Sequence, residues 1–252
     1  MGTAHYQQNL ATLRQNQHQT HCLQINLQHS RSATYNMMKM IEKDEPDLIF
    51  VQEPYEYQNR PVGIEKKCRV FTAGNGKRRA AICIPNNKTD AMLITQTSNE
   101  DTVVLEIIHK KIKFFTVSMY IDIDLQIENS FTNIDEILQF AKGARILIAT
   151  VSNARSKTWN DKITNSRGKK LEEYLASRHL HIINEESEMF TFHNSRRSGN
   201  IDLTITNNNL IADYVNGKLV KKRAVRTTIS SNIKSEIPTV IKTNTTTEVE
   251  DM

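Results

Sequence analysis

The chain has 252 residues, of which 38% are hydrophobic and 24% charged, so it is long enough to build one large core. Lys and Arg outnumber Asp and Glu by 33 to 28, and the net charge of +5 suits a polyanionic partner or an ordinary solvated surface. The sequence has no apolar run of about 18 residues, which excludes a membrane-spanning helix. The three cysteines, Cys22, Cys68 and Cys83, lack zinc-ligand spacing and favour a reducing, intracellular setting.

The first predicted elements are a strand, a helix and a second strand. Residues 1–21 are rich in Gln and poor in apolar side chains, and we expect a disordered lead-in there. Residues 22–28 alternate apolar and polar side chains, which predicts a strand that directs Asn26 away from its apolar face. An amphipathic helix follows, with one of the two nearby serines as its cap. The continuous apolar run before Glu53 then predicts a strand buried on both faces.

The middle of the chain is rich in strands. Residues 69–121 contain four or five β-type runs separated by polar turns, which is typical of an antiparallel sheet. Further helices are predicted near 129–142 and 167–179, and the strand at 146–149 leads directly into a polar loop. Because helix–strand units alternate with a β meander and no internal repeat occurs, the sequence predicts a two-layered α/β sandwich in one domain.

Polar side chains follow the apolar runs at five predicted strand ends, namely Asn26, Glu53, Tyr120, Asn153 and Asp202. Each of them alone is compatible with a turn or a solvated loop. Together they matter more, because open α/β sheets keep their chemistry where the strands end. One carboxylate with amides and a phenol around it can hold a single Mg²⁺, an ion that keeps several waters for a phosphate ligand.

Five segments occur in a specific order: QINL, FVQE, VSMY, SNARSKTW and FTFHNSRRSGNIDLTI. In this order they resemble the endonuclease/exonuclease/phosphatase superfamily, and specifically the apurinic-endonuclease-like endonuclease domain of arthropod non-LTR retrotransposons. The resemblance covers residues 22–216 and implies a DNase I-like fold. It also implies Mg²⁺-dependent nicking of target DNA, a nuclear location, and a reverse transcriptase domain in a longer parent protein. We expect a monomer that binds DNA and does not associate with membranes.

The resemblance also implies a role for each strand-end residue. Glu53 would hold the Mg²⁺, and Asn26 would orient ligands at the metal. Tyr120 and Asn153 would donate hydrogen bonds to phosphate oxygens as charge builds on them. Asp202 would pair with a histidine further along the chain and fix its tautomer.

Two positions depart from the pattern that the resemblance implies. The family's strand ends in Asp-x-Asn, where the Asp aligns the attacking water, and Val151 stands at that position. Valine accepts neither a proton nor a metal ion. The family's closing Ser-Asp-His is absent as well, because the last histidine, His193, precedes Asp202. Losing a member of a catalytic set costs about 10³ to 10⁶ in rate, so we expect impaired catalysis.

The tail suggests a genetic reason for the missing motif. From residue 217 the chain turns basic and then Thr-rich and acidic, which predicts an atypical, loosely ordered tail over residues 217–252. Permitted codons for residues 217–229, read in a shifted frame, spell KVSEEESCTDHN, which resembles the missing segment. We therefore hypothesise that a frameshift near Asn216 replaced the final strand and left its neighbour with an unpaired edge.

The basic side chains and the single tryptophan leave other functions open. By the resemblance, Arg155 and Trp159 would lie near DNA, although such a tryptophan more often packs in a core than stacks on a base. A non-cleaving nucleic-acid-binding module, or an inert remnant of a mobile element, would use Arg155 with Lys157, Lys169 and Lys170. The same charges suit a solvated helix face. A phosphodiester phosphatase needs the same Asp and His, and so it gains nothing from their loss.

Overall fold

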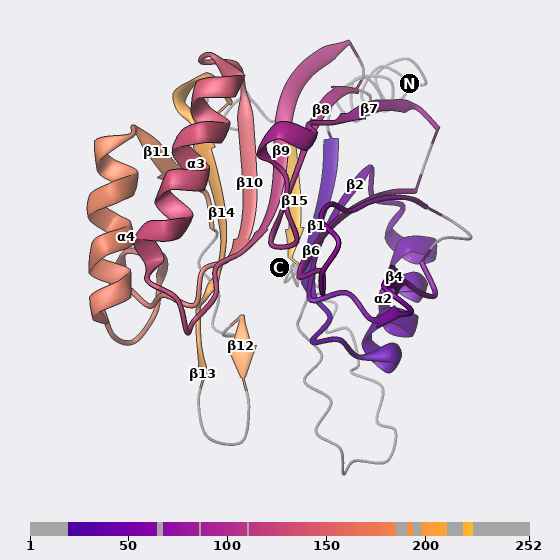
Figure 1. Cartoon of the computed structure of the whole chain (residues 1–252), viewed down its shortest axis with the longest axis horizontal. Coiled ribbons are helices and arrows are strands. Elements are labelled where there is room, and N and C mark those ends of the chain that lie inside the picture. The colour runs from indigo at the N-terminus through magenta and orange to yellow at the C-terminus, as the bar shows by residue number, and fades with distance from the viewer. Residues whose placement is uncertain are drawn as a thin grey trace, which may run out of the picture.

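Two β-sheets packed face to face form the centre of the molecule, with helices on their outer faces (Figure 1). The computed structural model describes residues 20–64, 68–85, 87–109, 111–184, 191–193, 198–210 and 219–223. The predicted α/β sandwich is confirmed.

Each sheet joins strands that lie far apart in the sequence. The first sheet contains, in spatial order, β15 (Leu219–Arg223), β1 (Thr20–Asn26), β2 (Leu48–Gln52), β6 (Ala80–Ile84) and β5 (Arg69–Phe71). The second contains β11 (Leu180–Ile182), β14 (Asp202–Asn207), β10 (Ile146–Val151), β9 (Ile112–Tyr120), β8 (Thr102–His109) and β7 (Thr89–Leu93). Two short hairpins pair β3 (Glu56–Tyr57) with β4 (Arg60–Pro61), and β12 (Phe192–His193) with β13 (Ser198–Gly199).

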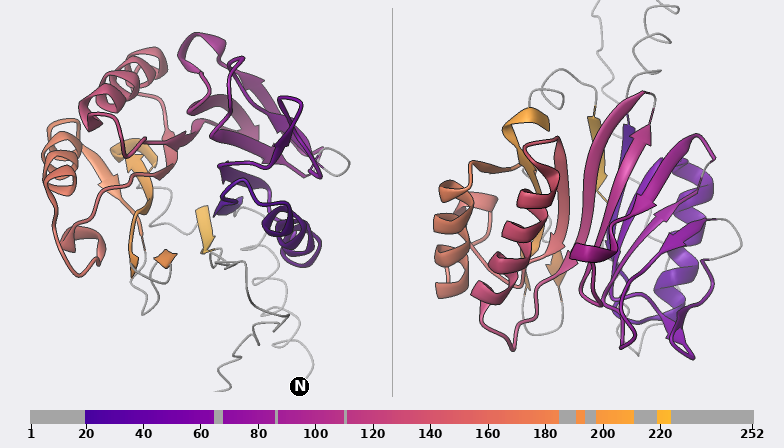
Figure 2. Two further views of the ribbon diagram at one scale, coloured as in Figure 1. Left: turned by 60° about the horizontal axis from the view of Figure 1, so that its bottom comes forward. Right: turned by 45° about the horizontal axis from the view of Figure 1, so that its top comes forward.

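The helices cover the outer faces of the two sheets (Figure 2). The first sheet carries α2 (Arg31–Asp44), and the second carries α3 (Ile127–Ala141) and α4 (Ser166–Ser177). Ser30 is the N-cap of α2 and its hydroxyl accepts from the Ala33 N–H, which satisfies one amide of the first turn. Single-turn 3₁₀ helices lie at Thr95–Thr97 and Lys157–Trp159. None of the helices in these described ranges is both long and apolar enough to cross a bilayer.

Side-chain alternation divides the core into three clusters. Leu23 and Ile25 of β1, and Leu27 directly after it, share one apolar face as the alternation predicted, and this face packs against α2. Cys22 on the same strand faces the space between the sheets and packs there with residues of β2, β6, β8 and β10. Two glutamines cross this inter-sheet space. Gln52 Nε2 donates to Ser118 Oγ at 3.0 Å and to the Ala149 carbonyl at 3.2 Å, and Gln24 Nε2 donates to the Thr150 carbonyl at 3.1 Å.

The ends of the domain differ from the sequence-based boundaries. The first strand begins at Thr20, within the range expected to be a lead-in. Residues 219–223 form β15, which pairs in parallel with β1, so the expected unpaired edge is covered in the structure. The boundary predicted at residue 216 is therefore too early by at least this strand. The remaining parts of the predicted lead-in and tail, 1–19, 217–218 and 224–252, lie outside the described residues.

Gly168, in the first turn of α4, tests how closely this helix approaches the loop after β10. A Cβ at this position would lie 1.9 Å from the carbonyl oxygen of Arg155. Alanine normally stabilises a helix relative to glycine by about 1 kcal/mol. Here the clash is with backbone, so Gly168→Ala should lower the free energy of unfolding by about 1–3 kcal/mol, measured by urea denaturation.

Gly76→Ala, whose Cβ would meet its nearest neighbour at 3.4 Å, is the control. Unchanged stability of the Gly168 variant would contradict this close approach.

Candidate active site at the strand ends

The strand register brings three of the predicted residues, Asn26, Tyr120 and Asp202, to one end of the inter-sheet space. On the second sheet, Val151 pairs with Tyr120 of β9 and with Asp202 of β14. On the first sheet, Asn26 pairs with Gln52. Paired residues share a face of a sheet. Each of the five side chains lies an even number of residues from a side chain of the same strand that faces the other sheet, so all five point into the space between the sheets. We refer to these five side chains as the strand-end row.

Several residues around the strand-end row have left-handed backbone without being glycine. Glu53, directly after β2, has φ 48°, and Asn153, just after β10, also has φ 48°. Gln28 and His29, in the turn between β1 and α2, have φ 50° and 52°. Such conformations cost free energy and cluster at functional sites in proteins. This strain supports the strand ends as a functional site independently of the residue types.

Glu53 and Asn26 lie at neighbouring strand ends. The Glu53 N–H donates to the Arg79 carbonyl at 2.9 Å, and its carboxylate is partly exposed, with Oε1 3.7 Å from Nε2 of His29. The Asn26 side chain is buried, and its Oδ1 accepts from the Gln28 N–H at 2.8 Å. Its Nδ2 is buried and finds no hydrogen-bond partner among the described residues. An amide held in this way is oriented to donate to an oxygen atom brought by a ligand.

Tyr120 of the second sheet is held by a cation, Arg79, which lies directly before β6 of the first sheet. The Arg79 guanidinium lies over its ring at 4.9 Å, and Arg79 is fixed by ion pairs with Asp101 and Asp122. Burial and the nearby Glu53 carboxylate raise the pKa of the Tyr120 phenol and outweigh the hydrogen bond with Asn153. The phenol therefore stays protonated at neutral pH and can donate a hydrogen bond.

Asn153 and Asp202 complete the part of the site on the second sheet. Asn153 Nδ2 donates to the Ile121 carbonyl at 2.9 Å, which orients the amide beside Tyr120. Asp202 begins β14, and its N–H donates to Thr191 Oγ1 at 3.2 Å. Between the strands of Tyr120 and Asp202, the Val151 side chain is 1% exposed. The strand-end row therefore has a methyl-bearing side chain where the resemblance implies a carboxylate.

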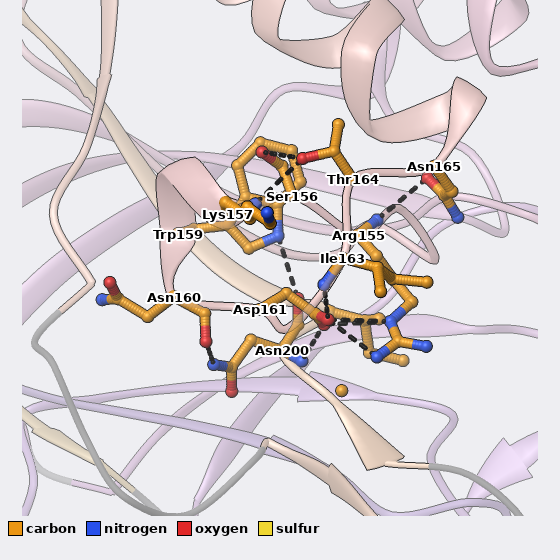
Figure 3. Close-up of polar contacts among 12 residues, drawn as sticks. Arg155, Ser156, Lys157, Trp159, Asn160, Asp161, Ile163, Thr164, Asn165 and Asn200 are labelled. Atoms are coloured by element: carbon orange, nitrogen blue, oxygen red, sulfur yellow. Dashed lines mark hydrogen bonds and ion pairs between the residues drawn. The ribbon is translucent and has the colours of Figure 1, made fainter.

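The loop after β10 is organised around a buried carboxylate, Asp161 (Figure 3). Its oxygens accept from Nε and Nη2 of Arg155, with 2.7 Å for the shortest contact, and from the Asn200 N–H at 2.7 Å. They also accept from the Ile163 N–H at 3.2 Å. Burial alone would raise the pKa of the Asp161 carboxyl, but these donors outweigh it and lower the pKa. This network fixes the loop that carries Asn153.

Both predicted DNA-binding residues, Arg155 and Trp159, make contacts within the protein. Trp159 is 2% exposed, and its indole N–H donates to the Asn200 carbonyl at 2.9 Å. It belongs to the core between α3, α4 and the second sheet, so its ring has no face available for stacking on a base. Arg155 is partly exposed, but its guanidinium is committed to Asp161. Both residues therefore hold the loop in place, and Trp159 packs in the core, which is the alternative that the sequence favoured for it.

Sequence reasoning missed several residues that shape the site. His29 lies beside Glu53, Arg79 lies over Tyr120, and Asp161 anchors the loop. None of them directly follows an apolar run, which was the signal used to find the others. Gln52 could have been found, since a polar residue at the last position of a buried strand is unusual.

Comparisons with known proteins assign the chain to a family. The sequence profile of the endonuclease-reverse transcriptase family matches residues 114–246, more than half of the 252 residues. The chain belongs to this family. The 115 kDa protein of the type-1 retrotransposable element R1DM of Drosophila melanogaster is 26% identical over 193 residues, which are 73% of this chain. The matched region is 19% of that protein, so the chain spans about a fifth of its relative.

Solved structures show the same fold. The endonuclease domain of TRAS1, a telomere-specific non-LTR retrotransposon, has a TM-score of 0.67 at 24% identity, covering 75% of this chain and 86% of that one. An AP endonuclease from Leishmania major has a TM-score of 0.59 at 9% identity, covering 77% and 80%. An AP endonuclease from Archaeoglobus fulgidus has a TM-score of 0.52 at 13% identity, covering 75% and 88%. The predicted superfamily and its non-LTR retrotransposon endonuclease branch are confirmed.

The donors at the strand ends are compatible with a hard divalent ion. In the described part of the chain, no three His, Cys, Asp or Glu side chains form a ready-made metal site. Mg²⁺ does not need one, because it commonly binds through one or two carboxylates and keeps several waters. Glu53 supplies a partly exposed carboxylate, and the unpartnered Asn26 amide can orient a bound water or phosphate oxygen.

Asp161 gives a test of the loop network. Asp161→Asn removes a buried charge that accepts several hydrogen bonds, so the free energy of unfolding at neutral pH should fall by about 2–3 kcal/mol. Because the folded-state pKa is lowered, this stability is complete above the unfolded pKa of about 3.9 and is lost as the pH falls through the folded value. Urea denaturation from pH 7 to pH 3 should show the gap to wild type closing below about pH 4.

The matched control for this measurement is Asp90→Asn, on an exposed position of β7. It should change stability by less than about 0.5 kcal/mol at any of these pH values. A gap between the Asp161 variant and wild type that stays constant down to pH 3 would show that the carboxylate charge does not hold the loop.

Proposed function

We propose that the strand-end row, together with Glu53 and Asn153 beside it, is the hydrolytic site of a target-DNA-nicking endonuclease, and that this copy has lost most of its catalytic activity. The proposal combines the family assignment with the chemistry of the residues at the strand ends. Mg²⁺ held by Glu53 would polarise the scissile phosphate and stabilise the departing oxygen.

The other residues of the site would bind and orient the phosphate. Tyr120, protonated at neutral pH, donates to a non-bridging phosphate oxygen, and Asn153 donates beside it. The Asn26 amide, whose Nδ2 is buried without a partner, fixes an oxygen ligand near Glu53. Arg79 keeps the Tyr120 ring in position through its contact with the ring face.

Val151 is the single observation that carries the impairment. It lies between Tyr120 and Asp202 in the register, on the face that opposes Asn26 and Gln52. Its side chain is buried and carries no hydrogen-bond acceptor that could align a water molecule. Without a carboxylate to align and deprotonate the attacking water, the rate should fall by about 10³-fold or more.

The absent Asp-His motif is a second loss within the same proposal. Asp202 is in place at the start of β14, but no histidine follows it in the sequence. We keep the frameshift hypothesis as its explanation, although the family match continues to residue 246 in the present reading frame. The coding DNA decides it: codons for residues 217–229 that fail to spell Asp-His in the shifted frame would refute the hypothesis.

Nicking of supercoiled plasmid in Mg²⁺ tests the impairment. The unmodified chain should relax plasmid no faster than its Glu53→Ala variant, because both lack a complete catalytic set. Circular dichroism should show both chains folded. Nicking by the unmodified chain well above the Glu53→Ala background would overturn the proposed impairment.

Binding without cleavage is the second candidate function. Of the four basic residues considered for it, Arg155 pairs with Asp161, and Lys170 pairs with Glu128 at 2.6 Å. Lys157 and Lys169 are exposed on the loop after β10 and on α4. Of these four residues, Lys157 and Lys169 would therefore contribute most to DNA binding.

The salt dependence of DNA binding measures how many phosphates Lys157 and Lys169 contact. If Lys157 and Lys169 each neutralise one phosphate, replacing both with Ala should make the slope of log K against log salt shallower by about 2, read from gel shifts at several salt concentrations. The control is Lys113→Ala, since Lys113 pairs with Glu106 at 2.8 Å near the opposite end of β9. Equal slopes for the double variant and wild type would remove this face from the DNA-binding surface.

A further inference from the structure

His29 meets Glu53 in a geometry that the proposed magnesium chemistry does not use. The turn between β1 and α2 is fastened to the end of β2, because the Leu27 N–H donates to the Gln52 carbonyl and the His29 N–H donates to the Glu53 carbonyl, both at 2.8 Å. The ring of His29 is thereby held next to the Glu53 side chain. Its Nε2 lies 3.7 Å from Glu53 Oε1.

The tautomer of His29 follows from its second ring nitrogen. Nδ1 lies 2.9 Å from the carbonyl oxygen of Pro54, and a carbonyl can only accept, so Nδ1 carries a proton and donates it. In the neutral ring, Nε2 then presents its lone pair toward the Glu53 carboxylate. Two electron-rich atoms face each other, and a cation between them satisfies both.

The surroundings match those of histidines that bind metals. Such histidines almost always donate their other ring N–H to a carboxylate, a backbone carbonyl or water, as His29 does to Pro54. Metal–nitrogen and metal–oxygen bonds of about 2.1 Å place two adjacent ligand atoms about 3.0–3.4 Å apart. The observed 3.7 Å needs a shift of only a few tenths of an ångström, and both side chains are partly exposed. His29 also lines an open cavity together with Tyr55, Glu56, Gln58, Asn59 and Lys77.

We propose that His29 and Glu53 together bind one divalent ion, and that the imidazole shifts the preference of the site from Mg²⁺ toward Mn²⁺ and Zn²⁺. Carboxylate and water ligands suit Mg²⁺ and Mn²⁺, whereas imidazole nitrogen suits Zn²⁺ and its neighbours. With only two protein ligands, water or a phosphate oxygen fills the remaining positions. The inference rests on the proposed role of Glu53 as a metal ligand and adds a ligand to it.

Titration of the full chain with Mn²⁺, followed by the loss of the free-ion electron paramagnetic resonance signal, measures the site directly. His29→Asn should weaken Mn²⁺ binding by about tenfold or more, while Mg²⁺ affinity from calorimetry should change by less than about twofold. Asparagine tolerates the left-handed backbone at residue 29. His179→Asn is the matched control, because His179 is exposed and also left-handed, with φ 53°.

The outcomes separate this inference from the proposed function. If Glu53→Gln abolishes binding of both ions while His29→Asn changes neither, the metal site stands and the added ligand is refuted. If the wild-type chain binds neither ion and shows no Glu53 dependence, the proposed metal site itself fails. Paramagnetic broadening by Mn²⁺ should reach the His29 ring resonances first. Broadening centred on other histidines would overturn the assignment, and thermal melting confirms that each variant is folded.

Discussion

The site depends on the two-residue alternation of side chains along β1, β2, β9, β10 and β14. Because Val151 pairs with Tyr120 on one side and with Asp202 on the other, the three side chains share one face of their sheet. Gln24 and Ser118 face the same inter-sheet space one step further from the strand ends, and Ser118 accepts a hydrogen bond from Gln52 of the strand-end row. A slip of one residue in β10 would turn Val151 toward the helices and disassemble the strand-end row.

The fold and the reaction place different demands on position 151. A carboxylate there would be largely desolvated, which costs free energy unless a metal, a proton or hydrogen bonds compensate it. Valine has a high preference for strands and buries its methyl groups without such compensation. The replacement that removes the water-aligning group is thus one that the scaffold tolerates. Under the proposed function, this explains how the described part of the chain keeps a DNase I-like sandwich around a catalytic set without its water-aligning carboxylate.

Much of this architecture could be predicted from sequence, for a clear physical reason. The apolar periodicity of β1 and α2 indicated which side chains face the core, and polar residues after apolar runs identified Asn26, Glu53 and Tyr120. Residues that act through long-range contacts could not be found in this way. Arg79 contacts Tyr120 across the space between the two sheets, and His29 contacts Glu53 from the turn after β1. Asp161 accepts hydrogen bonds from segments far apart in the sequence. Trp159 carried no local signal to separate a core residue from a base-stacking one.

The pairing of β15 with β1 shows another limit of sequence patterns. Residues 219–223 are basic and weakly periodic, so they gave no strand signal, but their backbone adds to an open edge of the first sheet. A strand pairs with a sheet edge through backbone hydrogen bonds, so this pairing does not require a particular pattern of side chains. A strand at this place does not restore the chemistry of the missing motif, because it supplies no histidine.

Restoring the lost groups tests the central claim most directly. A chain with Val151→Asp and with residues 217–229 replaced by KVSEEESCTDHN should nick supercoiled plasmid in Mg²⁺ far above the unmodified chain, and a further Glu53→Ala change should abolish the gain. If the restored chain is folded but nicks no better than the unmodified one, the strand-end row is not the hydrolytic site that we describe.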